Sequence, residues 1–273
     1  MKTIIVPVDF SEQSENALKV AVTLSQKHGA KIFALHMLEL SEALITSPEG
    51  MQQEQALFLI KLAEKRFKDL LEKPYLKGVK ITPIIKHFKV FSEVNHIALE
   101  HRADLVVMGS HGTDGLEEIF IGSNAEKVVR NSEVPVLVIK DYKENFEIKR
   151  IVFACDFMDE NLGPFKKAMD FADSVGSELQ LVYINIPGNE FLSTQDAYRR
   201  ISSFLQKAKV GKEVKIYNDY SVEEGVMNYG EHCNADVISI PTHGRKGLSR
   251  FFRGSLGENI ANRSKLPVLT FKI

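Results

Sequence analysis

The chain has only two cysteines in 273 residues, no strong charge of either sign and no long apolar run. Cys155 and Cys233 do not occupy equivalent positions in the repeat described below, so we expect reduced thiols and no disulfide framework. The formal net charge of -1 gives no general reason to expect a nucleic acid or an anionic membrane as a partner. No stretch reaches the roughly 20 apolar residues of a membrane helix. The first residues also lack a signal-peptide layout, so we expect a cytoplasmic protein.

The composition is that of an ordinary globular protein, with 44% hydrophobic and 26% charged residues. The length exceeds the roughly 100 to 200 residues of a typical single domain. Two domains, each with its own core, are therefore the better expectation.

A glycine signature occurs twice, each time after a short apolar run. A four-residue motif is followed, after nine intervening residues, by a small Gly-Ser pair, and the two copies are Gly109-Ser110-His111-Gly112 with Gly122-Ser123 and Pro241-Thr242-His243-Gly244 with Gly254-Ser255. Glycine lets the backbone approach a phosphate closely, and the pattern after each pair is helical. The second copy has a proline in place of the first glycine.

The beginnings of the two halves also correspond, because a shift of 147 residues relates Asp9 to Asp156, each at the end of an apolar strand-like run. The shift falls to 132 by His111 and His243, so the second half is 15 residues shorter in its middle. We assign the difference to an amphipathic helix that is longer in the first half. Its apolar positions are Ala56, Leu59, Ile60, Ala63, Phe67, Leu70 and Leu71, against Ala197, Ile201, Phe204, Leu205 and Ala208 in the second half.

Strands and helices alternate along each half, which predicts an α/β fold with a parallel sheet covered on both faces. We expect two doubly wound domains, each with five strands and four helices. Residues 1–141 form lobe 1, residues 148–273 form lobe 2, and the polar residues 142–147 link them. The last strands, near Val136 and Val268, are candidates to pair across the lobes, because an exposed apolar edge strand invites aggregation.

In open parallel sheets, ligands bind beyond the carboxyl ends of the strands. This rule places Pro7, Val8 and Asp9 beside Gly109 and the rest of the first glycine signature. The helix beginning near Gly122, Ser123 and Asn124 would offer free N–H groups to an anion. The acceptor-only carboxylate of Asp9 suits a ribose hydroxyl or an adenine amino group better than a phosphate. A helix-capping role together with Ser11 is an equally good interpretation.

The two loops carry opposite charge. The lobe 2 loop is basic, with Arg245, Lys246, Arg250 and Arg253, although a solvated helix face also explains these residues. The lobe 1 loop is acidic, with Asp114, Glu117 and Glu118, which would repel phosphates unless a divalent cation such as Mg²⁺ intervenes. Pro241 has no N–H and a fixed φ, so its backbone cannot replace that of Gly109. These differences favour one working site and one altered copy.

The motifs together resemble the universal stress protein family in its tandem two-domain form, over nearly the whole chain. The resemblance rests on Val8-Asp9-x-Ser11, Ala103-Asp104-Leu105-Val106-Val107-Met108-Gly109-Ser110-His111-Gly112, Gly122-Ser123-x-Ala125-Glu126-Lys127-Val128 and Val134-Pro135-Val136-Leu137-Val138. It implies the adenine nucleotide alpha hydrolase-like fold, pairing through the last strands as an intramolecular pseudo-dimer, and either ATP binding or no nucleotide binding. A homodimer is a further expectation.

By that resemblance, a set of lobe 1 residues matches positions that contact ATP: Pro7, Asp9, Met37, Gly109, Gly112, Gly122, Ser123 and Asn124. Val8, Met108 and His111 adjoin them and complete our lobe 1 candidates. Lobe 2 matches at Asp156, Gly244, Gly254 and Ser255 but departs at Pro241, which puts its nucleotide binding in doubt.

Three functions remain open. The first is an ATP-binding stress-response protein whose ligand alters its surface or association. The second is a nucleotide-free interaction protein, and the third is a very slow ATPase, although the sequence identifies no catalytic residue. A metal site at His96, Glu100 and His101 is disfavoured, because histidines five apart point about 140° away from each other on a helix.

Overall fold

The structure is a computed structural model that describes residues 1–38, 49–87, 90–110, 123–144, 146–242, 260–261 and 263–273. Within this part of the chain, no helix has the length and apolar character needed to cross a membrane.

Lobe 1 alternates strands and helices as expected. Its elements are β1 (Thr3–Pro7), α1 (Glu12–His28), β2 (Lys31–Leu38), α3 (Glu49–Leu71), the 3-10 turn η1 (Pro74–Leu76), β3 (Ile81–His87), α4 (Val90–Glu100), β4 (Leu105–Gly109), α5 (Ser123–Asn131) and β5 (Val136–Ile139).

Lobe 2 repeats this order. Its elements are β6 (Arg150–Ala154), the 3-10 turn η2 (Asp159–Asn161), α6 (Leu162–Val175), β7 (Glu178–Asn185), α7 (Thr194–Ala208), β8 (Val214–Asn218), α8 (Val222–His232), β9 (Val237–Thr242) and β10 (Val268–Lys272).

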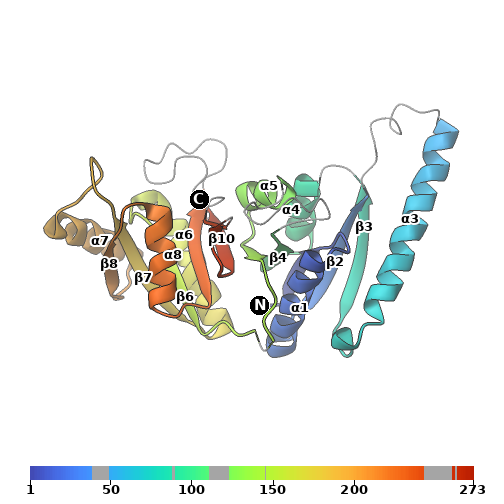
Figure 1. The fold of residues 1–273 in the computed structure, drawn as a ribbon, viewed down its shortest axis with the longest axis horizontal. Helices are drawn as coiled ribbons and strands as arrows, with labels where there is room; N and C mark the ends of the chain where they lie inside the picture. The colour runs from blue at the N-terminus through green and yellow to red at the C-terminus, as the bar shows by residue number, and fades with distance from the viewer. Residues whose placement is uncertain (39–48, 88–89, 111–122, 145, 243–259, 262) are drawn as a thin grey trace.

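The ten strands form one continuous sheet, in the order β3-β2-β1-β4-β5-β10-β9-β6-β7-β8. Pairing is parallel within each lobe, and β5 pairs antiparallel with β10 at the junction. Figure 1 shows the two lobes side by side along the longest axis, with α3 at one end and α7 at the other. The predicted fold class and the pairing of the last strands are both confirmed.

The junction has the register of a twofold axis. Leu137 lies opposite Leu269, and these two residues occupy the same position in the repeat. On either side of that pair, Val138 lies opposite Val268 and Val136 opposite Thr270. All of these residues are buried, so the two lobes meet through paired backbone strands whose side chains are buried and mostly apolar. The lobes therefore pair as the two subunits of a symmetric dimer would.

The hydrophobic core is organised by sheet face rather than by lobe. One cluster of buried residues includes Leu24 on α1 and Phe67 on α3 together with Phe165 on α6 and Phe204 on α7. The other gathers the buried sides of α4, α5 and α8. Each cluster contains residues from both lobes, because the sheet that separates the two faces runs without interruption through the junction. The burial of apolar surface therefore stabilises both lobes together.

The helix ends have capping residues that can be recognised in the sequence. Ser11 caps α1 by accepting a hydrogen bond from the Ser14 backbone N–H. Gly29 and Gly176 end α1 and α6 with φ angles of 70° and 71°, a left-handed conformation that glycine adopts at little cost.

The predicted helix accounts for eight residues of the length difference between the lobes, with 23 residues in α3 and 15 in α7, and the remaining difference lies outside these helices. The predicted apolar face of α3 is only partly confirmed. Ala63, Phe67 and Leu70 are buried, but Leu71 is exposed, and the first-half positions Ala56, Leu59 and Ile60 are only half-buried. The first half of α3 thus packs less closely than its apolar spacing predicts.

Candidate functional site

Several candidate residues meet at the carboxyl edge of the lobe 1 sheet. Pro7 at the end of β1 is aligned with Leu35 of β2, two residues before Met37. On the other side of β1, Ile5 is aligned with Val106, so the end of β4 at Gly109 lies beside the residues that follow β1. Neighbouring strands are about 4.8 Å apart. Asp9, Met37 and Gly109 therefore share one edge of the sheet.

Asp9 is held by the residue that caps α1. One carboxylate oxygen, Oδ1, accepts hydrogen bonds from the Ser11 backbone N–H at 2.9 Å and from the Ser11 hydroxyl at 2.5 Å. The side chain is half-buried, and within the described residues no partner bonds its other oxygen, Oδ2. The capping interpretation and the ligand interpretation are thus compatible, because each uses a different oxygen of one carboxylate.

The residue after Asp9 has an unusual backbone. Phe10 has a φ of 65°, which is rare for a residue with a side chain. Its ring packs on His36 and Phe67, with ring centroids 4.7 and 5.1 Å away, and the Arg66 guanidinium lies 5.6 Å above it. This aromatic cluster stabilises the turn that directs Asp9 to the sheet edge.

The opposite face of the sheet supplies apolar side chains at the same edge. Met37 and Met108 belong to the core cluster beneath α4 and α5, and both are buried. They come from β2 and β4, the two strands that flank β1. Two buried methionines and the Asp9 carboxylate thus lie near the same edge of the sheet.

Gly109 has a packing role that sequence reasoning missed. A Cβ atom added there would lie 2.8 Å from the backbone carbon and oxygen of Gln13 in the first turn of α1. That distance is too short for a real contact, so glycine is required for α1 to approach β4. The only sign of this packing role in the sequence was the glycine itself, which we interpreted as a phosphate-binding residue.

The amino end of α5 faces the same sheet edge, because a crossover helix runs opposite to its strands. Asn124 lies in its first turn and is exposed. The other candidates on the glycine signatures, namely His111, Gly112, Gly122, Gly244, Gly254 and Ser255, lie outside the described residues, as does the side chain of Ser123.

The equivalent aspartate in lobe 2 has a different environment. Asp156 is only 3% exposed. Its Oδ1 accepts hydrogen bonds from the Met158 backbone N–H at 2.9 Å and from the Asn161 side-chain amide at 2.6 Å. Burial raises the pKa of Asp156, and these two hydrogen bonds oppose the rise. The carboxylate is thus part of the lobe 2 interior.

The neighbours of Asp156 also differ from those of Asp9. Phe157 repeats the left-handed backbone of Phe10, with a φ of 55°. The register of β6 and β7 places Tyr183 at the position of His36 and Ile184 at that of Met37. Pro241 lies within β9, and the chain forms the 3-10 turn η2 where lobe 1 already begins α1. The lobe 2 edge therefore has the same backbone turn as lobe 1 but different side chains around the aspartate.

The cysteine and histidine side chains considered as reactive groups are buried or contact neighbouring side chains. Cys155 is buried, and that burial raises the pKa of its thiol well above the usual value. His96 lies 3.8 Å from Glu100 in an ion-pair geometry, whereas His101 stacks on Phe33 with the ring centroids 4.2 Å apart. The two histidines therefore have separate partners.

One motif residue has the same contact in both lobes. Asp104 accepts a hydrogen bond from the Thr3 backbone N–H at 2.9 Å, and Asp236 accepts one from the Arg150 backbone N–H at 2.8 Å. Each contact joins the residue before β4 or β9 to the start of the first strand of its lobe. This part of the repeated motif supports the fold rather than a ligand.

Comparison with known proteins gives a consistent result over both lobes. The model of the Universal stress protein family matches residues 1–140 and 147–272. The chain is 32% identical over 143 residues to Universal stress protein MJ0531 of Methanocaldococcus jannaschii, covering 52% of this chain and 84% of that protein. It is 24% identical to Universal stress protein E of Salmonella typhi over 299 residues, covering 99% of this chain and 94% of that protein.

Solved structures share the tandem arrangement. A universal stress protein from Archaeoglobus fulgidus superposes with a TM-score of 0.71 at 22% sequence identity, covering 99% of this chain and 96% of that one. At this level of identity the likeness concerns the fold, and it extends over both lobes.

Proposed function

The chain belongs to the universal stress protein family, and we propose that it is a stress-response protein that binds ATP in lobe 1 and acts through ligand-dependent regulation or interaction. Lobe 2 serves in this proposal as the paired partner of lobe 1. Residues 1–141 and 148–273 are the proposed bounds of the two domains.

The observation that carries the proposal is that the Asp9 Oδ2 atom has no hydrogen-bond partner within the described residues. Ser11 fixes the orientation of the carboxylate through Oδ1, and Oδ2 is left to accept a hydrogen bond from a ribose hydroxyl or an adenine amino group. Because the acceptor is already oriented, little ordering entropy opposes binding. The apolar side chains of Met37 and Met108 lie at the same sheet edge and suit a purine ring.

The phosphates would lie toward the glycine signature and the amino end of α5, where helix N–H groups and the helix dipole favour anions. We propose Gly112, Gly122 and Ser123 for this role from their place in the family motif. Mg²⁺ would offset the repulsion from the acidic residues of the intervening loop. ATP hydrolysis is not part of the proposal, because no general base is identified in the described residues.

Lobe 2 is proposed to bind no nucleotide. Asp156 is buried, and its bonded oxygen is committed to Met158 and Asn161, so a ligand could reach the carboxylate only if the turn opened. The stoichiometry should therefore be one nucleotide per chain.

Titration calorimetry of the full chain with ATP and Mg²⁺ tests the proposal. Asp9→Ala should weaken binding by about 10- to 100-fold, the usual effect of losing a hydrogen bond to a charged group. Asp156→Asn is the matched control, because it removes the lobe 2 charge and keeps the acceptor oxygen. It should leave affinity and stoichiometry unchanged.

The absence of ATP and ADP binding in the wild-type chain would overturn the proposal in favour of a nucleotide-free interaction protein. Two nucleotides per chain would overturn the assignment of lobe 2. Mass measurement of ligands released by denaturing freshly purified protein gives an independent answer. The cytoplasmic location and a homodimer stay predictions, which cell fractionation and analytical ultracentrifugation test.

A further inference from the structure

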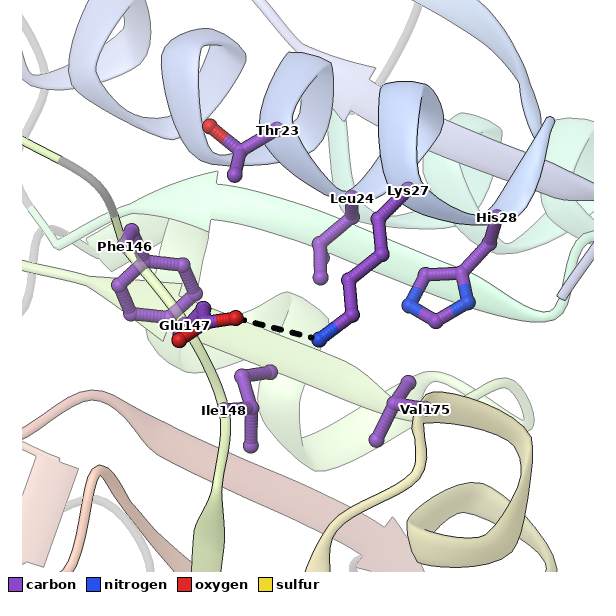
Figure 2. Close-up of a pocket in the computed structure, with 8 residues that line it drawn as sticks. All are labelled: Thr23, Leu24, Lys27, His28, Phe146, Glu147, Ile148 and Val175. Carbon is purple, nitrogen blue, oxygen red and sulfur yellow. Dashed lines mark ion pairs between the residues drawn. The ribbon is translucent and has the colours of Figure 1, made fainter.

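A cavity of about 260 Å³ lies between the lobes, at the end of the sheet opposite to Asp9. Figure 2 shows that its wall is formed by the last turns of α1, by residues 146–148 where the linker meets lobe 2, and by Val175 at the end of α6. Lobe 1, the linker and lobe 2 thus all contribute to one cavity. Its volume is near the lower limit of roughly 300 Å³ for small-molecule sites.

One cationic and one anionic side chain, Lys27 and Glu147, line the cavity, and a second cation, Lys149, lies beside Glu147. The Glu147 carboxylate lies between two lysines, with Lys149 Nζ 2.8 Å from Oε2 and Lys27 Nζ 3.6 Å from Oε1. The Lys149 contact is the closer one, and both lysines are largely exposed. Lys27 can therefore take a second anionic partner while Glu147 keeps Lys149.

His28 adds a polar atom without a protein partner. Its Nε2 atom is buried and has no hydrogen bond within the described residues. Burial lowers the pKa of His28, and the charge of neighbouring Lys27 lowers it further. The imidazole is therefore neutral near pH 7, and a neutral ring with its proton on Nε2 can donate one hydrogen bond to a ligand.

Apart from Thr23 and Glu147, the rest of the wall is apolar. Leu24, Phe146 and Val175 are all buried residues that line the cavity. Figure 2 shows the Lys27 side chain extending between the His28 ring and Glu147. The cavity therefore combines a cationic group and a hydrogen-bond donor on α1 with an apolar surface from the linker and α6.

We propose that this cavity binds a small organic carboxylate, with its charged group on Lys27 and His28 and its apolar part against Leu24, Phe146 and Val175. A planar ring of benzoate size matches the volume. The bound molecule would contact both lobes and the linker. Such a ligand would hold the lobes together by interactions that neither lobe can make alone.

This site is independent of the proposed nucleotide site. The two sites lie at opposite ends of α1, which has 17 residues and a length of about 25 Å. Changes at Lys27 should therefore leave ATP binding unaltered, which makes ATP titration a check that each variant is folded.

Proton NMR of the full chain provides the test, with benzoate as the probe. The His28 imidazole signals, assigned from a His28→Gln variant, should shift and saturate with a dissociation constant of roughly 1 mM, typical of a ligand this small. Lys27→Met should weaken binding at least about tenfold, because a charge-assisted hydrogen bond is lost. Lys167→Met removes an exposed lysine from α6 and should have no effect.

Benzamide, which is neutral and nearly the same shape, should bind at least about tenfold more weakly than benzoate. Equal affinity for the two probes would overturn the assignment of an anion. Unshifted His28 signals, or a Lys27→Met variant that binds benzoate as the wild type does, would overturn the site, leaving a cavity that holds only water.

Discussion

Asp9 and Asp156 occupy the same position in two halves of one chain, yet their surroundings are opposite. Both follow a first strand, and both precede a phenylalanine with a positive φ. Asp9 is half-buried and bonded through one oxygen to Ser11, whereas Asp156 is buried and bonded to Met158 and Asn161. The difference arises from neighbouring residues, since Met158 and Asn161 replace Ser11 and Ser14 in the repeat.

This comparison teaches that an aspartate can persist in a repeat for two different physical reasons. In lobe 1 the half-buried carboxylate has one oxygen without a partner among the described residues, and we propose that a ligand uses it. In lobe 2 the same carboxylate satisfies buried donors, which is a contribution to stability. Substitutions in matched pairs can separate these roles.

The largest difference between the lobes should come from Gly109→Ala. The new Cβ would contact the Gln13 backbone at 2.8 Å, so α1 must move away from β4. We expect a loss of about 3 kcal/mol in the free energy of unfolding, the upper part of the range for overpacking. Pro241→Ala, at the equivalent lobe 2 position, should cost about 1 kcal/mol or less. Urea unfolding of both variants measures the contrast, and equal losses would contradict the packing role of Gly109.

Removing the two carboxylates should have the next largest effect. Asp156→Ala removes the acceptor of the Met158 N–H and leaves the buried Asn161 amide without its partner, which should cost about 2 kcal/mol. Asp9→Ala should cost under about 1 kcal/mol, because water can reach its partners. The same urea measurements apply. A larger loss for Asp9→Ala would reverse our assignment of the structural and ligand-binding roles.

The pH dependence of stability should separate charge from hydrogen bonding at Asp156. Its folded-state pKa is raised above the ordinary 3.8, so its stabilising effect is fully present below that pH and is lost as pH rises through the folded pKa. Asp156→Asn can keep both hydrogen bonds to Oδ1 and does not titrate. The unfolding free energy of this variant should therefore rise relative to wild type across that window. A constant difference between the two proteins from about pH 4 to pH 7 would contradict this expectation.

The smallest effect should be at the junction. Thr270 takes the position of Val138 in the repeat, and its hydroxyl donates a long hydrogen bond of 3.4 Å to the Val136 carbonyl. Thr270→Val restores the symmetric residue and should change the unfolding free energy by less than about 1 kcal/mol. Thermal unfolding is a sufficient measurement. A large loss would mean that the lobes need this polar contact to pair.

The fold could be predicted because its signals are local and repeated. Apolar runs mark the buried strands, Gly29 and Gly176 end helices at equivalent positions, and eight residues of the 15-residue difference lie in the predicted helix. The partial exposure of the first half of α3 could not be predicted. Ala56, Leu59 and Ile60 have helical spacing but are only half-buried, because spacing does not say whether another element reaches that part of the helix.

The candidate site was predictable only in outline. The position of Asp9 at the sheet edge follows from strand order, but the division of its two oxygens depends on the Ser11 rotamer. The packing role of Gly109 depends on the approach of Gln13, a contact between distant segments. The structural role of Asp156 likewise depends on a hydrogen bond from the side chain of Asn161, five residues along the chain, which the sequence pattern does not predict.

The antiparallel pairing of β5 with β10 also has a consequence for the evolution of the sequence. In a dimer of identical chains, every substitution appears on both sides of the axis, so a residue that suits only one subunit is still imposed on the other. Here Leu137 and Leu269 meet as twofold mates within a single chain. A substitution at position 241 is therefore carried by one half alone, and position 109 in the other half is unaffected.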